Sequence, residues 1–352
     1  MSRFFSEKYA SLAPYVPGEQ PKDKKYIKLN TNESPFPPSP MACNAAAEAA
    51  KDLQLYSDPE CTGLVRTAAK MLGVEPEQIL FTNGSDEVLN FAFMAFCDQK
   101  TPAIFPDITY GFYKVFAQIN GVPYRQMPLK ADFTVDIGDY LSCESTVFLA
   151  NPNAPTGLSL PLEDIEKIVR SNPNRVVVID EAYVDFGGES AMPLIQKYDN
   201  LLVVQTFSKS RSLAGGRLGF AVGCKELIRD LKTIQYSTNP YNVNRMTMAA
   251  GIGALEDTQY FESNCKKIRE NRAWTTDALR KMDFTVLDSN TNFILARHST
   301  LGGKTLYLRL KEEGILVRHF DTARLTDYVR ITIGSSEQMQ ILVNTVKKIL
   351  EE

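Results

Sequence analysis

The stretch Leu201–Phe220 reads LLVVQTFSKSRSLAGGRLGF, and it decides the fold. Its first four residues are all apolar, which is typical of a strand covered on both faces, as in a parallel sheet. Thr206, Ser208 and Lys209 follow this strand, and Arg217 comes after them in a glycine-rich turn. Ligands of open α/β sheets bind at the carboxyl ends of the strands. We therefore expect a binding site at this turn.

The chemistry of these side chains favours one kind of ligand. A lone lysine is usually a solvated side chain, but this lysine lies between hydroxyl residues and is followed by an arginine. A lysine amine can form an imine with an aldehyde, and two hydroxyls with an arginine can clamp a phosphate. Pyridoxal 5'-phosphate carries both groups, so the residues around Lys209 predict this cofactor.

Other short apolar runs also stop at polar or glycine-rich residues. They are Ile79–Phe81, Val147–Ala150, Val176–Ile179 and Gly219–Val222. Helical segments lie between them: Asp86–Phe96 is strongly apolar, and Pro161–Arg170 has a proline at the expected first helical position. This alternation predicts an α/β domain over residues 40–245.

The pattern changes in the C-terminal part of the chain. A long charged helix is expected at Asp257–Met282, strands at Thr291–Ala296 and Val329–Ile333, and a last helix after Ser335, whose spacing to Gln338 fits a capping box. These elements predict a smaller α+β domain over residues 246–352. Residues 1–39 are expected to form an N-terminal arm that ends in a proline-rich linker.

A second strand supplies another pair of candidate residues. The run Val176–Ile179 ends in Asp180 and Glu181, and Tyr183 follows. An aspartate at this place is also a good helix cap, so alone the motif is weak. A pyridoxal cofactor, however, needs a carboxylate that keeps its ring nitrogen protonated. It also benefits from a hydroxyl near its ring oxygen. Asp180 and Tyr183 supply both groups.

Two further segments join a strand to the residues that follow it. Phe81–Asp86 leads into a helix whose free backbone N–H groups would bind a phosphate, although a plain turn explains it equally well. Asn151–Gly157 is rich in asparagine, proline and glycine, and a turn is sufficient to explain it.

Taken in order, these four segments resemble the fold-type I pyridoxal-phosphate-dependent aminotransferases, and the chain is most similar to the histidinol-phosphate aminotransferase family. Further matching segments are Ala13–Tyr15, Leu29–Glu33, Leu55–Asp58, Thr109–Tyr113, Thr291–Phe293, Gly314–Arg318 and Val329–Gly334. The resemblance covers nearly the whole chain. It implies an α/β fold, with a mostly parallel seven-stranded sheet between helices in the large domain and a smaller α+β domain.

The resemblance also implies a role for each candidate residue. Lys209 would form an aldimine with the cofactor and move the substrate proton, Asp180 would pair with the pyridine nitrogen, and Tyr183 would contact the ring oxygen. The remaining cofactor contacts would be Gly84, Ser85, Asp86, Tyr110, Asn153, Thr206, Ser208, Arg217 and, from the other subunit of a homodimer, Tyr56. The expected substrate contacts are Tyr15, Asn32, Tyr241, Arg318 and Arg330.

The chain departs from the family pattern at four places. Ala154 stands where the family has an asparagine that bonds the ring oxygen, so either Asn153 compensates or Tyr183 acts alone. Ser34, Ile108 and Gly216 also replace more usual residues. None of these four positions bears on the lysine chemistry.

The implied reaction converts histidinol phosphate and 2-oxoglutarate to imidazole acetol phosphate and glutamate, in ping-pong half-reactions of histidine biosynthesis. Two alternatives on the same fold are a threonine-phosphate decarboxylase and an aromatic amino acid aminotransferase. A third alternative, a non-catalytic cofactor-binding regulator, is disfavoured because Lys209, Asp180 and Arg217 are all present. A dinucleotide enzyme is disfavoured because no G-x-G-x-x-G opens a helix after a strand.

Composition narrows the remaining classes. The 352 residues carry a formal net charge of −3, without the basic stripe expected of a nucleic-acid-binding protein. The two histidines and six cysteines form no C-x-x-C or other usual metal spacing, so no metal is expected. No run approaches the roughly 20 apolar residues that span a bilayer. Scattered cysteines and the absence of an apolar signal region favour a cytoplasmic protein.

Overall fold

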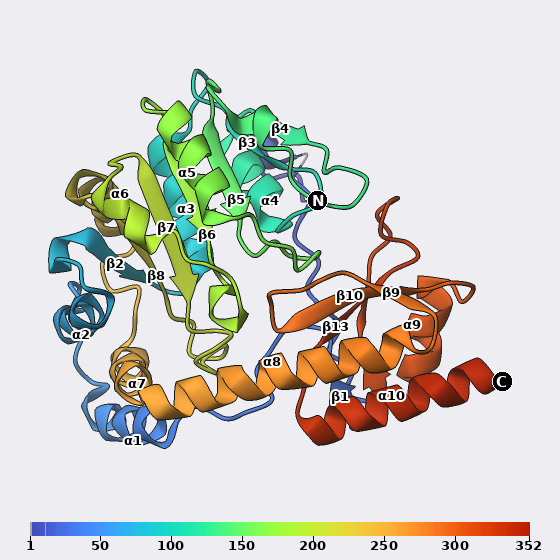
Figure 1. Cartoon of the computed structure of the whole chain (residues 1–352). Helices are drawn as coiled ribbons and strands as arrows, with labels where there is room; N and C mark the ends of the chain where they lie inside the picture. Colours follow the sequence, from blue (N-terminus) through green and yellow to red (C-terminus); the bar gives the residue numbers. More distant parts are fainter. Residues whose placement is uncertain (1, 11) are drawn as a thin grey trace.

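The computed structural model describes residues 2–10 and 12–352 and contains a seven-stranded sheet (Figure 1). Its strands are β2 (Ile79–Thr82), β3 (Ala103–Pro106), β4 (Tyr124–Met127), β5 (Thr146–Ala150), β6 (Val177–Asp180), β7 (Leu201–Thr206) and β8 (Gly219–Gly223). They lie in the order β2-β8-β7-β6-β5-β3-β4. Only β8 runs antiparallel to its neighbours, β2 and β7, so the predicted mostly parallel sheet is confirmed.

Helices cover both faces of this sheet. They are α1 (Pro40–Ala49), α2 (Thr62–Leu72), α3 (Ser85–Phe96), α4 (Phe112–Asn120), α5 (Leu162–Ser171), α6 (Lys225–Thr238) and α7 (Arg245–Glu256). Alternate residues of one strand enter different cores: Ile79 and Phe81 pack with α2, α5 and α7, whereas Leu80 packs with α3, α4 and α6. Both strand faces are therefore apolar, which explains the continuous Val/Ile/Leu runs of the sequence.

A smaller unit follows, led by the long helix α8 (Thr258–Arg280), which runs from α7 along the lower edge of Figure 1. Its antiparallel sheet has the order β12-β13-β10-β9. The strands are β9 (Phe284–Val286), β10 (Phe293–His298), β12 (Arg318–His319) and β13 (Val329–Thr332), and the helices are α9 (Gly303–Glu312) and α10 (Ser336–Glu351). The Ser335–Gln338 capping box is present, as predicted.

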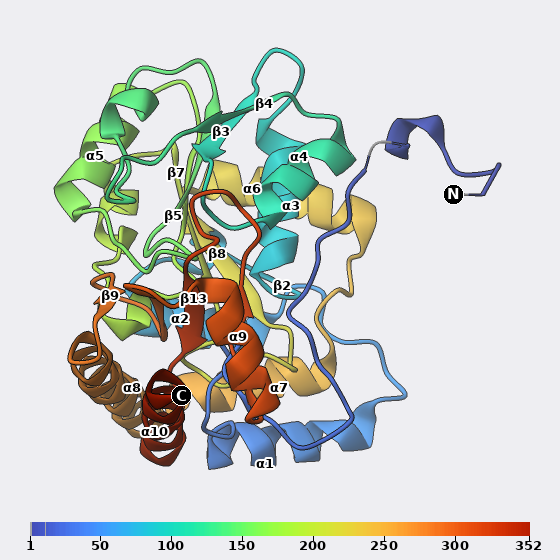
Figure 2. The ribbon, with the colours of Figure 1, turned by 90° about the vertical axis from the view of Figure 1, so that its right-hand side faces the viewer.

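The N-terminal arm joins this smaller unit. Strand β1 (Ile27–Lys28) pairs in parallel with β11 (Ile315–Leu316), and Leu29 is buried in the core of the smaller unit. Figure 2 shows the arm, in blue, descending from the upper right of the view toward α1. The described part of the arm also contacts the larger unit, where Tyr15 stacks on Phe112 of α4.

The boundary predicted at residue 245 between the large and the small domain remains a prediction. The packing of α7 indicates on which side of the boundary this helix lies. Helix α7 buries Ala250, Ala254 and Leu255 in the core of the seven-stranded sheet. It also makes its most extensive contacts with α1. By its packing, α7 goes with the larger unit, and the chain passes to the smaller unit at α8.

Candidate active site

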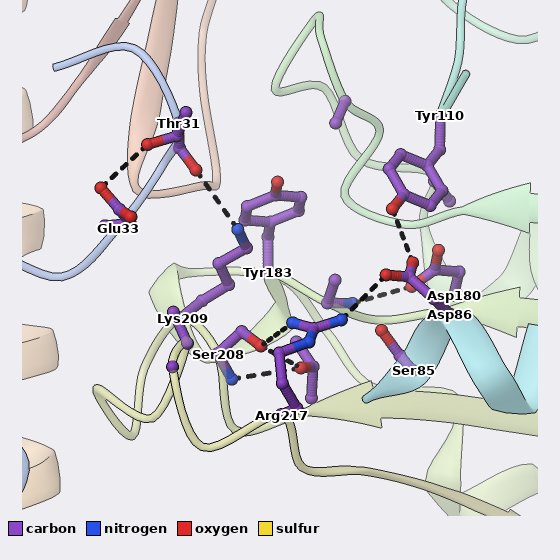
Figure 3. Close-up of a pocket in the computed structure, with 16 residues that line it drawn as sticks. Thr31, Glu33, Ser85, Asp86, Tyr110, Asp180, Tyr183, Ser208, Lys209 and Arg217 are labelled. Atoms are coloured by element: carbon purple, nitrogen blue, oxygen red, sulfur yellow. Dashed lines mark hydrogen bonds and ion pairs between the residues drawn. The ribbon is translucent and has the colours of Figure 1, made fainter. Parts of the chain in front are cut away.

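A cavity of about 340 Å³ lies at the carboxyl ends of β6 and β7 (Figure 3). Asp180 is the last residue of β6, Lys209 follows β7, Arg217 precedes β8, and Ser85 is the first residue of α3. The strand order brings these segments together, although they are far apart in the sequence. The predicted site at the turn after β7 is thus part of a cavity.

Lys209 extends its amine into this cavity. Its Nζ lies 3.5 Å from the carbonyl oxygen of Thr31 and 5.6 Å from the centre of the Tyr183 ring. Among the described residues, this amine forms no ion pair. An amine that is held only by one long hydrogen bond is free to react with an aldehyde.

Asp180 lies buried at the wall of the cavity. Tyr113 donates its hydroxyl to Oδ2 at 2.9 Å, and the backbone N–H of Ala182 donates to Oδ1 at 3.2 Å. Burial raises the pKa of this carboxyl to about 6. A cation placed against it would offset that burial and favour the charged carboxylate. A protonated pyridine nitrogen is such a cation, so Asp180 fits the predicted cofactor.

Another part of the cavity wall, around Arg217, is suited to an anion. Arg217 forms an ion pair with Asp86 at 3.0 Å and lies 3.5 Å from the hydroxyl of Ser208, which also accepts a hydrogen bond from Thr206. Gly84 has φ +85°, and a Cβ there would come 2.6 Å from Nη2 of Arg217. The glycine therefore keeps space beside the guanidinium at the start of α3, where free N–H groups favour a phosphate.

A second cavity of about 560 Å³ adjoins the first, and both are lined by Tyr110, Tyr183 and Lys209. Arg330 lies half-buried in its wall, where Nη2 donates to the carbonyl of Asn30 at 3.0 Å. Its Nε has no partner among the described residues. Burial lowers the pKa of this guanidinium. Because a cation that is partly withdrawn from water without an anionic partner is costly, Arg330 favours an anionic ligand.

Tyr15 and Arg318 also line this second cavity. The ring of Tyr15 stacks on Phe112 at 4.3 Å, and Arg318 donates to the carbonyl oxygens of Val16 and Pro17. Two arginines and the lysine thus face one space next to the first cavity. This arrangement suits a substrate that carries a carboxylate or a phosphate.

Most of the predicted site residues lie around the two cavities. Those that line one or both are Tyr15, Asn32, Ser85, Asp86, Tyr110, Asp180, Tyr183, Thr206, Ser208, Lys209, Arg217, Arg318 and Arg330. Gly84 contacts Arg217 beside them. Tyr56 and Tyr241 line neither cavity; they stack on each other at 4.7 Å, and Tyr56 is 81% exposed.

Asn153 does not fit the role considered for it. Its amide donates to the carbonyl of Ile108 and to the hydroxyl of Thr156, both at 3.0 Å, and its Oδ1 accepts from Thr109 at 2.8 Å. Its polar atoms are therefore engaged in holding the turn, and the methyl group of Ala154 faces the cavity instead. The prediction that Asn153 contacts the cofactor is not supported by this geometry.

Sequence reasoning missed the hydroxyl that holds Asp180. Tyr113 is fully buried in the first turn of α4, three residues after Tyr110. Burial, with Asp180 beside it, raises its pKa well above the ordinary value, so it remains a donor. A pair of tyrosines spaced by three residues lies on one side of a helix start, and this spacing was the available signal.

The chain is similar to known proteins in both sequence and structure. The family model for aminotransferase class I and II matches residues 24–346. A histidinol-phosphate aminotransferase from Brachyspira hyodysenteriae is 50% identical, and one from Clostridium botulinum is 44% identical; the matches cover 100% of this chain and of each relative. The crystal structure of histidinol-phosphate aminotransferase from Sinorhizobium meliloti in complex with pyridoxal-5'-phosphate is similar, with a TM-score of 0.90, 25% identity and 99% coverage of both chains.

Proposed function

The chain belongs to the class I and II aminotransferase family, and on this basis we propose that it transfers an amino group between histidinol phosphate and 2-oxoglutarate. It is a pyridoxal-phosphate-dependent enzyme by this membership. The proposed products are imidazole acetol phosphate and glutamate, in histidine biosynthesis. The two full-length relatives named for this activity support the choice of substrate.

One observation carries the proposal: the cavity that contains Asp180 and Arg217 meets, at Lys209, a second cavity that contains the half-buried Arg330, whose Nε has no partner among the described residues. The first cavity has a place for a phosphate, a ring nitrogen and an aldehyde. The second has a place for an anionic substrate beside the same amine. Histidinol phosphate and glutamate are both amines with an anionic group, so one arginine-lined space can accept each in turn.

The proposal gives a task to each of the main residues of the two cavities. Pyridoxal phosphate, when bound, supplies an aldehyde that condenses with amines and a protonated ring that withdraws electrons from the substrate carbon. Lys209 would hold the cofactor through its amine and would move the proton at the reacting carbon of the substrate. Asp180 keeps the ring nitrogen protonated, and Arg217 and Ser208 hold the phosphate. Arg330 and Arg318 orient the anionic end of the substrate.

The proposal includes a homodimer. Tyr56 and Tyr241 are aromatic residues that lie exposed and away from both cavities of their own chain. In a dimer, Tyr56 would reach the cofactor phosphate of the other subunit, and Tyr241 would reach the substrate bound there.

A cytoplasmic location belongs to the same proposal, supported by six cysteines that are all free. Among the described residues, no helix is both long and apolar enough to cross a membrane.

A substrate panel tests this proposal. The cofactor-loaded protein is mixed separately with histidinol phosphate, threonine phosphate, phenylalanine and glutamate, and its visible spectrum is followed. We expect histidinol phosphate and glutamate to convert the cofactor to its amine form. Release of carbon dioxide from threonine phosphate would instead indicate the decarboxylase, and a response to phenylalanine and glutamate but not to histidinol phosphate would indicate an aromatic aminotransferase.

A second experiment tests the cofactor site itself. Borohydride reduction should fix the mass of the cofactor on the peptide that contains Lys209, as measured by mass spectrometry. Lys209→Arg, which keeps the charge, is the matched control and should yield no modified peptide. A protein that takes up no pyridoxal phosphate would contradict the whole proposal.

A further inference from the structure

The hydroxyl of Tyr183 is held by a residue of the N-terminal arm. Nδ2 of Asn32 donates to this hydroxyl at 3.0 Å. The tyrosine ring also meets Phe293 edge to face, with centroids 5.1 Å apart. One contact from the N-terminal arm and one from β10 therefore fix the position of the tyrosine, while its ring lines both cavities.

The amide of Asn32 is in turn oriented by Thr332, on β13. The backbone N–H of Asn32 donates to the Thr332 hydroxyl at 2.9 Å, so the proton of that hydroxyl is available for another acceptor. It is donated to Oδ1 of Asn32 at 3.1 Å. With Oδ1 facing the threonine, the NH₂ group faces Tyr183.

The backbone of Asn32 is held as firmly as its side chain. Asn292 donates to its carbonyl oxygen at 3.0 Å, and the residue is 1% exposed. Its φ of 57° lies in the left-handed region, which asparagine tolerates better than most residues but which still carries strain. The surrounding hydrogen bonds keep it there, and a strained, buried residue that touches a cavity side chain points to function.

The direction of the hydrogen bond to Tyr183 has a chemical consequence. A tyrosine hydroxyl has one proton, and here it accepts from Asn32, so that proton remains free for a partner in the cavity. Nearby, Ala154 presents only a methyl group, and Lys209 lies 5.6 Å from the centre of the ring. Tyr183 is thus a hydroxyl donor in the wall of the cavity that also contains Ala154 and Lys209.

We propose that Asn32 is a positioning residue that fixes Tyr183 as a hydrogen-bond donor to the ring oxygen of bound pyridoxal phosphate. This inference rests on the proposed function. It gives the side chain of Asn32 a different task from the substrate contact expected from the sequence: both ends of its amide are already engaged, and it acts through the tyrosine. It also gives the N-terminal arm a part in setting the properties of the cofactor.

The test measures the pH at which the visible absorption of the bound cofactor changes. A donor to the ring oxygen favours the form in which this oxygen is negative, so loss of the donor should raise the midpoint. We expect Asn32→Gly to raise it by roughly 0.5–1 unit, the size of one neutral hydrogen bond. Glycine accepts the left-handed backbone, so this variant removes the amide without adding strain.

A double-mutant cycle separates positioning from a general structural effect. Tyr183→Phe should raise the midpoint at least as much as Asn32→Gly, and the double variant should show no further rise. Thr332→Val should also raise the midpoint, because it frees the Asn32 amide to turn. Thr332→Ser keeps the hydroxyl and should have the wild-type midpoint. If Asn32→Gly folds poorly, comparison of the midpoints of Thr332→Val and Thr332→Ser tests the inference instead.

Two results would overturn this inference alone. One is a cofactor-loaded Asn32→Gly protein with the wild-type midpoint. The other is an Asn32→Gly effect of full size in the Tyr183→Phe background. A wild-type chain that takes up no pyridoxal phosphate would instead overturn the proposed function, and this inference with it.

Discussion

Two adjacent carboxyl groups, those of Asp180 and Glu181, are both buried but have different surroundings. Asp180 faces the cavity, whereas Glu181 accepts hydrogen bonds from Ser190, the backbone of Ala191 and Gln205 at 2.6–2.8 Å. Burial raises the pKa of Glu181 from 4.5 to about 7 despite these donors. The sequence identified Asp180 through its place after a strand, but it gave no sign that the next residue would also be buried.

This raised pKa predicts how the stability depends on pH. Between pH 4.5 and about 7, Glu181 keeps its proton in the folded chain and loses it in the unfolded chain. The folded state then binds more protons, so stability falls as pH rises through this window. Glu181→Gln should remove roughly 1–3 kcal/mol of that fall. Urea unfolding at pH 5 and pH 8 measures it.

The matched control for this prediction is Glu262→Gln, the same chemical change at an exposed position of α8. It should leave the pH dependence of the wild type unchanged. If Glu181→Gln also follows the wild-type curve, the carboxyl of Glu181 does not take up a proton in this range.

Arg330 allows activity and stability to be separated. Arg330→Ala should lower kcat/KM for both amino substrates about tenfold to a hundredfold, because a charged hydrogen bond to the substrate is lost. The free energy of unfolding should change little, since the half-buried guanidinium has one hydrogen bond, an Nε without a partner among the described residues, and only two longer contacts with the rings of Phe293 and Phe320. Steady-state kinetics and urea unfolding measure the two effects.

Arg229→Ala, at an exposed position of α6, is the matched control and should change neither quantity. A parallel loss of activity and stability in Arg330→Ala would mean that the arginine supports the fold. An unchanged kcat/KM would remove it from the substrate site.

At the scale of elements, the sequence predicted those whose signal is local. Strands β5, β6, β7 and β8 coincide with the apolar runs within one or two residues, and α8 begins one residue after the predicted Asp257. Helix α5 begins at Leu162 because Pro161 is its N-cap. Strand β4 was missed because its residues, YRQM, are half-exposed at the sheet edge and lack the apolar run. Helix α7 was not predicted, because Gly251 and Gly253 lower the helix propensity of its sequence.

Gly219 of β8 packs closely against the loop that leads into α3. A Cβ on Gly219 would collide with the backbone nitrogen of Ser85 and lie 2.5 Å from the carbonyl carbon of Gly84. The obstacle is backbone, so the loop that leads into α3 would have to move. Gly219→Ala should therefore weaken pyridoxal phosphate binding and lower the stability by about 1–3 kcal/mol. Absorbance titration and urea unfolding measure both.

Gly302→Ala provides the comparison, because a Cβ at Gly302 meets no atom within 4 Å. It should bind the cofactor as the wild type does, with a stability change of roughly 0.5 kcal/mol or less. Wild-type cofactor affinity in Gly219→Ala would show that the loop can move without losing the phosphate.

At the scale of the whole molecule, the site is assembled from three parts that no single sequence segment contains. The larger sheet supplies Lys209 and Asp180, the smaller sheet supplies Arg330, and the arm supplies Asn32. Lys209 and Asp180 could be predicted from the sequence, because both follow apolar runs and the carboxyl ends of parallel strands meet at one edge of the sheet. The arginine was expected only through a family resemblance, since the packing of one sheet against another has no local signal.

The proposed dimer adds a fourth part, and mixing two defective chains tests it. In Lys209→Ala homodimers, no site has the reactive amine. In Tyr56→Ala homodimers, every site lacks the tyrosine that would hold the cofactor phosphate, so activity should fall about tenfold, the cost of one hydrogen bond to a charged group. A mixed dimer differs from both, because the Tyr56→Ala subunit has its own Lys209 and receives Tyr56 from the Lys209→Ala subunit.

If Tyr56 acts across the interface, one of the two sites in each mixed dimer is therefore complete. Random exchange makes about half of the dimers mixed, so an equimolar mixture should recover roughly a quarter of wild-type activity. If Tyr56 served its own subunit, the same mixed dimer would have no complete site, and activity would stay at the level of diluted Tyr56→Ala enzyme. Refolding the chains together and measuring activity decides between these outcomes, with chains mixed but not refolded as the control.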